Sequence, residues 1–163
     1  MTLNKLLYIV TIAIFNVFII LSPSFAGEVN LPGGAKITIP SGYTQSKSDD
    51  EINLSRENPF TEISIISENM EMEVPVDFAG KEFAKELESS GAMKINKSEK
   101  TIINGREFYV IHGTVTEEGI TVSMTAYICS IKTYMYCITC GCFNKDIEKL
   151  SKEFRQIVGS IKR

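Results

Sequence analysis

Between Gly91 and Cys140 the sequence reads as one strand after another, and this run constrains the fold more than any other feature. Strand-like segments cover residues 94–103, 106–116, 120–130 and 134–140. Asn104-Gly105 separates the first two, and Asn-Gly between such segments is a strong hairpin signal. A further turn is expected around Glu118-Gly119. The sequence therefore predicts a meander of antiparallel strands.

Shorter strand-like segments precede the meander at 36–39, 52–56 and 61–67, and Pro40-Ser41-Gly42 is expected to end the first. Two segments instead have helical spacing. Residues 77–90 have Asp77 as the expected N-cap and Gly91 as the stop, and their expected apolar face consists of Phe78, Phe83, Ala84 and Leu87. At the C-terminus the apolar positions recur every three or four residues: Ile147, Leu150, Phe154, Ile157 and Ile161. These elements predict an α+β protein, an antiparallel sheet of about six strands flanked by two main helices as an αβα sandwich.

The N-terminal segment differs from the rest of the chain. An apolar run covers residues 6–22, and the small residues Ser24 and Ala26 occupy the −3 and −1 positions of a cleavage site. We expect a signal peptide over 1–26, cleavage after Ala26, and a single domain over 27–163 that is periplasmic or secreted. The alternative is a retained anchor, which would be the only membrane contact of the protein.

Composition narrows the function classes. A chain of 163 residues has room for one ordinary domain, and 44% hydrophobic with 23% charged residues is typical of a globular protein. The formal net charge of −3 argues against nucleic acid as a partner.

Three short motifs follow one another in an order that resembles the PsbP-like superfamily. They are Ile37-Thr38-Ile39-Pro40-Ser41-Gly42-Tyr43, Thr101-Ile102-Ile103-Asn104-Gly105 and Phe154-Arg155-Gln156-Ile157-Val158-Gly159-Ser160-Ile161. That group includes the extrinsic photosystem II protein, a nuclear import factor that binds a small GTPase, and many exported bacterial domains. The resemblance covers residues 35–161 and implies an antiparallel sheet between helices and a non-catalytic role.

The four cysteines all lie near the last predicted hairpin: Cys129, Cys137, Cys140 and Cys142. Export favours disulfides. A register with Ile131 opposite Met135 keeps apolar residues on common faces and places Cys129 opposite Cys137, which predicts a bridge between them. The alternative is a two-residue Lys132-Thr133 turn, which mixes the faces and places residues that disfavour positive φ in the turn.

Two interpretations of Cys140-Gly141-Cys142 remain open. In the first, Cys140 and Cys142 form a second disulfide bridge or are two buried structural thiols. The second is a thiolate metal or redox site formed by Cys137, Cys140 and Cys142. Against it, a structural zinc site needs four ligands, His112 is the only imidazole, and Cys137 and Cys140 are expected on opposite strand faces.

Other chemistry is sparse. His112 lies inside a strand without a nucleophile motif, and no Gly-rich phosphate loop is present. Asp49-Asp50-Glu51 lacks the pattern of a calcium loop. Met70 and Met72 alternate with acids in a segment that reads as a connector, although methionines can also form an adaptable binding surface. We therefore expect that the protein is not an enzyme and that it binds no cofactor.

These features predict an exported, non-catalytic binding or accessory module that acts on a protein or envelope partner. Its sign would be an exposed aromatic patch that includes Tyr43, Phe60 or Tyr134. The alternative is a thiol-based metal-binding or redox protein that uses the segment from Cys137 to Cys142. A small apolar ligand between sheet and helix is a third option.

Overall fold

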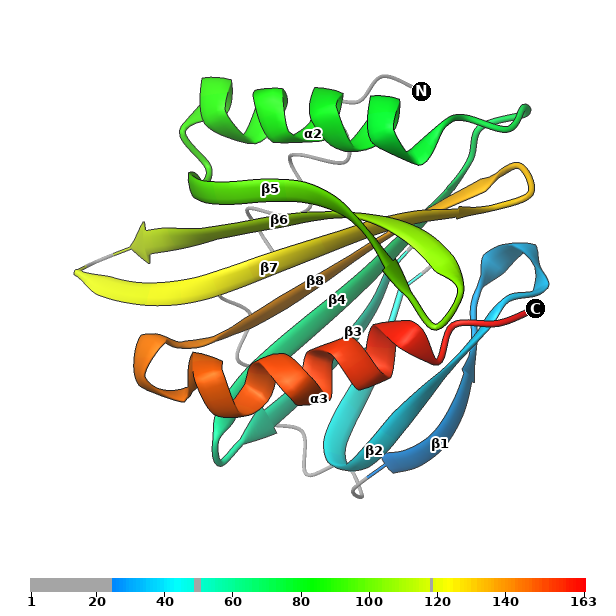
Figure 1. Cartoon of the computed structure of the whole chain (residues 1–163). Coiled ribbons are helices and arrows are strands. Elements are labelled where there is room, and N and C mark those ends of the chain that lie inside the picture. The colour runs from blue at the N-terminus through cyan, green and yellow to red at the C-terminus, as the bar shows by residue number, and fades with distance from the viewer. Residues whose placement is uncertain (1–24, 49–50, 118) are drawn as a thin grey trace.

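The computed structural model describes residues 25–48, 51–117 and 119–163, which form an α+β protein with one antiparallel sheet and two helices (Figure 1). The predicted signal peptide lies outside the described residues except for Phe25 and Ala26, as do Asp49 and Asp50 of the acidic loop. The strands are β1 (Phe25–Asn30), β2 (Lys36–Lys47), β3 (Glu51–Glu57), β4 (Phe60–Asn69), β5 (Lys94–Ile103), β6 (Arg106–Glu117), β7 (Ile120–Ile131) and β8 (Tyr134–Phe143). The helices are α2 (Val76–Ser90) and α3 (Ile147–Gly159), with short 3-10 turns η1 (Pro32–Gly34) and η2 (Asn144–Asp146).

The sheet consists of two four-stranded meanders placed side by side. Its strand order is β1-β2-β3-β4-β8-β7-β6-β5, and every neighbouring pair is antiparallel. The meander predicted after Gly91 is confirmed as β5 to β8. The prediction of about six strands is wrong, because the sheet has eight.

The segment expected to stop the first strand lies inside β2. Residues 36–39 and Tyr43 of β2 pair with β1, with a register shift between them, and residues 44–47 pair with β3. Pro40 lacks a backbone N–H and Gly42 has a φ of 98°, so this irregular stretch lies just before the strand changes partner. Pro and Gly therefore mark a change of partner here, not a strand end.

Two clusters of buried residues hold the helices against the sheet. Phe108 and Val110 of β6 belong to the cluster that contains α3, while Tyr109 and Ile111 belong to the cluster that contains α2. Alternate residues of a strand point to opposite faces, so the two clusters lie on opposite faces. However, α2 packs mainly on β5 to β7, and α3 mainly on β2, β8 and β5. Each helix covers part of the sheet, so the full αβα sandwich of the prediction does not describe it.

The helix predictions are confirmed in position, with two corrections in α2. Pro75 occupies the N-cap position and Asp77 lies in the first turn, bonded to Lys81 instead of capping the backbone. Phe78 has the spacing of the apolar face but is 62% exposed, because the face toward the sheet is formed by residues 76, 80, 83 and 87. Gly91 ends the helix in the left-handed conformation, as predicted.

Candidate interaction surface

The β7–β8 hairpin has the alternative register, with a two-residue turn at Lys132-Thr133. Ile131 pairs with Tyr134 across a two-residue turn, and Lys132 adopts a φ of 59°. Cys129 therefore lies opposite Tyr136, and Cys137 opposite Ile128. The prediction that Cys129 faces Cys137 is wrong.

Contacts outside the hairpin explain this register. The Tyr136 hydroxyl donates a hydrogen bond to the Pro32 carbonyl, and the Tyr136 side chain is fully buried. Gly33 leaves space for the Tyr134 ring, since a Cβ at residue 33 would lie 2.5 Å from Tyr134 Cδ2. These contacts fix which face of β8 meets the N-terminal turn, and they offset the unfavourable backbone conformation at Lys132.

The cysteines are four buried free thiols divided between the two faces of the sheet. Cys129, Cys140 and Cys142 belong to the cluster under α3, and Cys137 belongs to the cluster under α2. The predicted Cys129–Cys137 bridge required these two residues to lie opposite each other, and in the structure they do not. The alternative thiolate site from Cys137, Cys140 and Cys142 is not assembled either. Within residues 25–48, 51–117 and 119–163, no group of three or more His, Cys, Asp or Glu side chains could hold a metal ion.

Burial also favours the neutral form of the thiols. It raises the pKa of Cys129 and of Cys137 to about 12, and the pKa of Cys142 to about 11. The pKa of Cys140 is also raised, first by burial and then by its neighbours Cys142 and Cys137. The thiolate is the form that attacks disulfides and binds metals. Neutral thiols at physiological pH give the redox and metal alternative no support.

The surroundings of His112 indicate a structural role for this side chain. Its Nδ1 lies 3.0 Å from the Thr125 hydroxyl oxygen, and burial lowers the pKa of the imidazole. Lys97 and Glu99 form an ion pair of 2.8 Å on the neighbouring edge strand. This arrangement holds the ring between two strands.

The three aromatic residues considered for an exposed patch are buried or half-buried. Tyr43 is fully buried beneath α3. The Phe60 ring packs 4.9 Å from the Phe143 ring, and the Tyr134 ring stacks 6.3 Å from the Tyr136 ring. Tyr43 therefore contributes to no exposed patch, and Phe60 and Tyr134 are half-buried.

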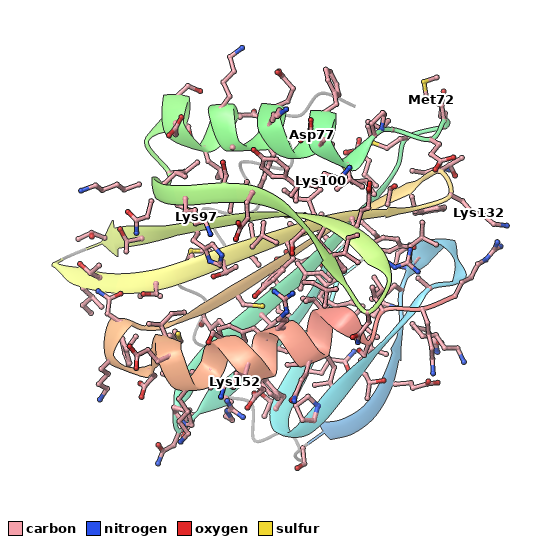
Figure 2. All side chains as sticks on the ribbon, viewed as in Figure 1. Met72, Asp77, Lys97, Lys100, Lys132 and Lys152 are labelled. Atoms are coloured by element: carbon pink, nitrogen blue, oxygen red, sulfur yellow. The ribbon has the colours of Figure 1, made fainter. Side chains whose placement is uncertain are left out.

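The exposed large apolar side chains of the described chain lie elsewhere: Met72 (67%), Ile102 (63%), Phe78 (62%) and Ile120 (49%). Met72 and Phe78 lie close together in the sequence, around the start of α2. Figure 2 shows Met72 at the tip of the connector between β4 and α2, directed away from the sheet. We call this region the connector surface and define it as Glu71, Met72, Glu73, Asp77 and Phe78.

The backbone on both sides of the connector surface is anchored. The Met70 N–H donates to the Thr133 carbonyl in the β7–β8 turn at 2.8 Å, and the Asn69 side chain accepts the Glu71 N–H at 3.1 Å. The Ala79 N–H bonds to the Pro75 carbonyl at 3.1 Å and closes the first turn of α2. Met72 thus lies in a short loop whose two ends are held by hydrogen bonds.

The connector surface is acidic. Glu71 and Glu73 are exposed and form no ion pair with any described residue, while Asp77 binds Lys81 at 2.6 Å. Residues 68–88 contain seven acidic residues and two lysines. The alternation of Glu and Met was the signal in the sequence. The exposure of Phe78 had no such signal, because its spacing fitted the apolar face of the helix.

No helix in the described part of the chain combines the length and the apolar character needed to cross a membrane. No family model matches the sequence, and no curated protein matches it.

Several solved structures share the fold at low sequence identity. Cyanobacterial PsbP from Synechocystis is 10% identical with a TM-score of 0.64, over 89% of this chain and 95% of that protein. LpqN of Mycobacterium tuberculosis, described as involved in cell envelope biogenesis, is 12% identical with a TM-score of 0.58, over 86% of this chain and 92% of that one. The Ran-binding protein Mog1p of Saccharomyces cerevisiae is 10% identical with a TM-score of 0.58, over 85% and 95%. The resemblance found in the sequence is confirmed at the level of the fold: this chain has the PsbP-like fold.

Proposed function

We propose that this protein is a non-catalytic accessory module that binds a protein partner through the connector surface. The observation that carries the proposal is the exposure of Met72 and Phe78 between acidic side chains. Exposed apolar side chains rimmed by polar ones mark interaction sites. Mog1p, which shares the fold, is described as Ran-binding, and this supports a binding role for the fold without naming a partner.

The chemistry of the connector surface defines the partner that would fit it. Phe78 offers a rigid aromatic anchor, and Met72 offers a flexible one that adapts to an apolar pocket. Glu71 and Glu73 would pair with Lys or Arg at the rim of that pocket and speed association. The partner is thus a protein with an apolar depression bordered by basic residues.

The proposed site of action is outside the cytosol, after cleavage behind Ala26. This cleavage would fall within β1 and leave Gly27–Asn30 of that strand. These residues would keep their pairing with Ile39 to Lys36 of β2. LpqN, which is described as involved in cell envelope biogenesis, supports an envelope setting.

Photo-crosslinking in the producing cells tests the binding role. A photoreactive amino acid would replace Met72, Phe78, Ile102 or Ile120, one at a time. We expect one discrete protein adduct from residues 72 and 78, identified by mass spectrometry. Ile102 and Ile120 are matched controls because they are exposed apolar residues outside the connector surface.

A charge-reversal variant sharpens the result. Glu71→Lys with Glu73→Lys should abolish the adduct at residue 78 while the thermal midpoint stays unchanged, because both side chains are exposed and unpaired among the described residues. Equal adducts at Ile102 or Ile120, or an adduct insensitive to the charge reversal, would contradict the proposal.

A further inference from the structure

A second charged surface lies on the outward side of α3 and the turn before it. Lys145, Lys149 and Lys152 are exposed and are spaced four and three residues apart, so they share one side of the helical segment. Arg155, also exposed, lies one turn further on. Glu148 is the one exposed acid of α3. We call Lys145, Lys149 and Lys152 the lysine stripe.

The other acid of α3 does not neutralise the lysine stripe. Glu153 turns inward, where it accepts a hydrogen bond from the Tyr43 hydroxyl and pairs with Arg56 at 3.0 Å. Its charge is compensated beneath the helix, so the outer side keeps an excess of positive charge.

The stripe lysines form no ion pair with any described residue, whereas several other surface lysines are paired. Lys81, Lys97 and Lys100 pair with Asp77, Glu99 and Glu107 at 2.6 to 2.8 Å. In contrast, the stripe offers three free ammonium groups in a row.

We propose that the lysine stripe docks the protein on the anionic phospholipid headgroups of a membrane surface. Phosphate-rich surfaces attract clustered lysines as point charges. A protein partner is less suitable, because interface cores are depleted in Lys and need apolar or aromatic anchors. The exposed large apolar residues of the described chain all lie outside α3.

This inference goes beyond the proposed protein binding and concerns another part of the molecule. In Figure 2, Lys152 on α3 and Met72 on the connector lie at opposite sides of the view. A protein docked by the lysine stripe would thus keep its connector surface free for a partner.

Each lysine near an anionic leaflet increases the membrane affinity about fivefold, so the three lysines of the stripe together increase the affinity roughly 100-fold. Because the whole chain has a net charge of −3, attraction to an anionic surface requires an orientation that presents this side. Binding should therefore be weak, dependent on the stripe and sensitive to salt.

Vesicle co-sedimentation tests the inference with the protein as the producing cells process it. The probes are phosphatidylcholine vesicles with and without about one third phosphatidylglycerol, at salt concentrations from about 0.05 M to about 0.5 M. We expect binding to the anionic vesicles at low salt, loss at high salt, and roughly 100-fold weaker binding for Lys145→Gln/Lys149→Gln/Lys152→Gln. Neutral vesicles give the background.

The matched control is Lys47→Gln/Lys85→Gln/Lys94→Gln, which removes three exposed lysines that also lack an ion pair with any described residue. It should bind as the wild type does. The inference fails if anionic vesicles bind no better than neutral ones, or if both triple variants lose affinity equally. It also fails if the stripe variant binds vesicles normally but loses an acidic protein partner. None of these outcomes bears on crosslinking at Met72.

Discussion

At the scale of the residue, Tyr43, Arg56 and Glu153 form a polar cluster that joins three elements beneath α3. The Arg56 guanidinium lies 4.6 Å from the centre of the Tyr43 ring and contacts both carboxylate oxygens of Glu153. Arg56 also donates to the Thr61 hydroxyl at 3.3 Å. The Arg56 and Glu153 side chains are only 15% and 28% exposed, so this ion pair is poorly screened by solvent.

Removing one partner of this cluster should be costly. Glu153→Ala leaves Arg56 half-enclosed without its counter-charge, and we expect a loss of about 2 kcal/mol in the free energy of unfolding, measured by urea denaturation. Lys97→Ala breaks an exposed pair and should change stability by less than about 0.5 kcal/mol. Similar small effects for both substitutions would show that the cluster contributes little.

Glu62 should make stability depend on pH. Burial raises the pKa of its carboxyl from 4.5 to about 7. The folded state therefore binds the proton more tightly than the unfolded state, so the contribution of Glu62 to stability is largest below about pH 4.5 and is lost as pH rises toward 7. After a discount for partial exposure, the loss is about 1 kcal/mol.

Glu62→Gln removes this titration. The variant should be more stable than the wild type at pH 8 by about 1 kcal/mol, and the difference should vanish near pH 4. Urea denaturation at several pH values measures both. Parallel stability profiles for the two proteins would refute the assignment.

At the scale of the element, the β7–β8 hairpin shows how a local rule yields to tertiary contacts. The rule that Lys-Thr is a poor two-residue turn is sound, yet Lys132 has a φ of 59°. Tyr136 is fully buried and bonded to Pro32 only in the observed register. A shift by one residue would move every side chain of β8 to the other face.

Thiol labelling checks this hairpin. In native protein at pH 8, we expect no cysteine to react with an alkylating reagent within minutes, and all four to react in denaturant without reductant, because they are buried free thiols. Mass spectrometry counts the labels. A Cys129–Cys137 peptide in the unreduced digest would restore the rejected register.

At the scale of the whole molecule, the N-terminal strand completes the sheet. β1 pairs only with β2, but Val29 and Leu31 are each 4% exposed and belong to the cluster under α3. Lys162 also bridges to Lys36 and pairs with Glu28 at 2.6 Å. Both ends of the described chain are therefore joined at this edge.

Truncation tests this arrangement and the domain boundary. A chain that begins at Gly27 should fold with nearly the stability of the longer chain. A chain that begins at Ala35 should lose about 3 kcal/mol or more, since it loses the burial of Val29 and Leu31. Circular dichroism with thermal denaturation measures both. Equal midpoints would show that β1 does not stabilise the sheet.

Local patterns in the sequence determined the antiparallel meander, both helices and the general fold. These features depend on residues that are close together in the sequence: the alternation along the strands, the Asn104-Gly105 turn and the apolar spacing in α3. The Glu and Met alternation also marked the connector.

Only the tertiary structure decided the hairpin register, the burial of Tyr43 and the exposure of Phe78. Each depends on residues distant in the sequence: Pro32 with Tyr136, Glu153 with Tyr43, and Gly80 of α2 with the Tyr109 ring of β6. The position of β1 has the same origin, because its short sequence pairs with a strand that Pro40 and Gly42 divide between two partners. Contacts of this kind compete with local preference, and they prevail where they bury large side chains or satisfy polar groups.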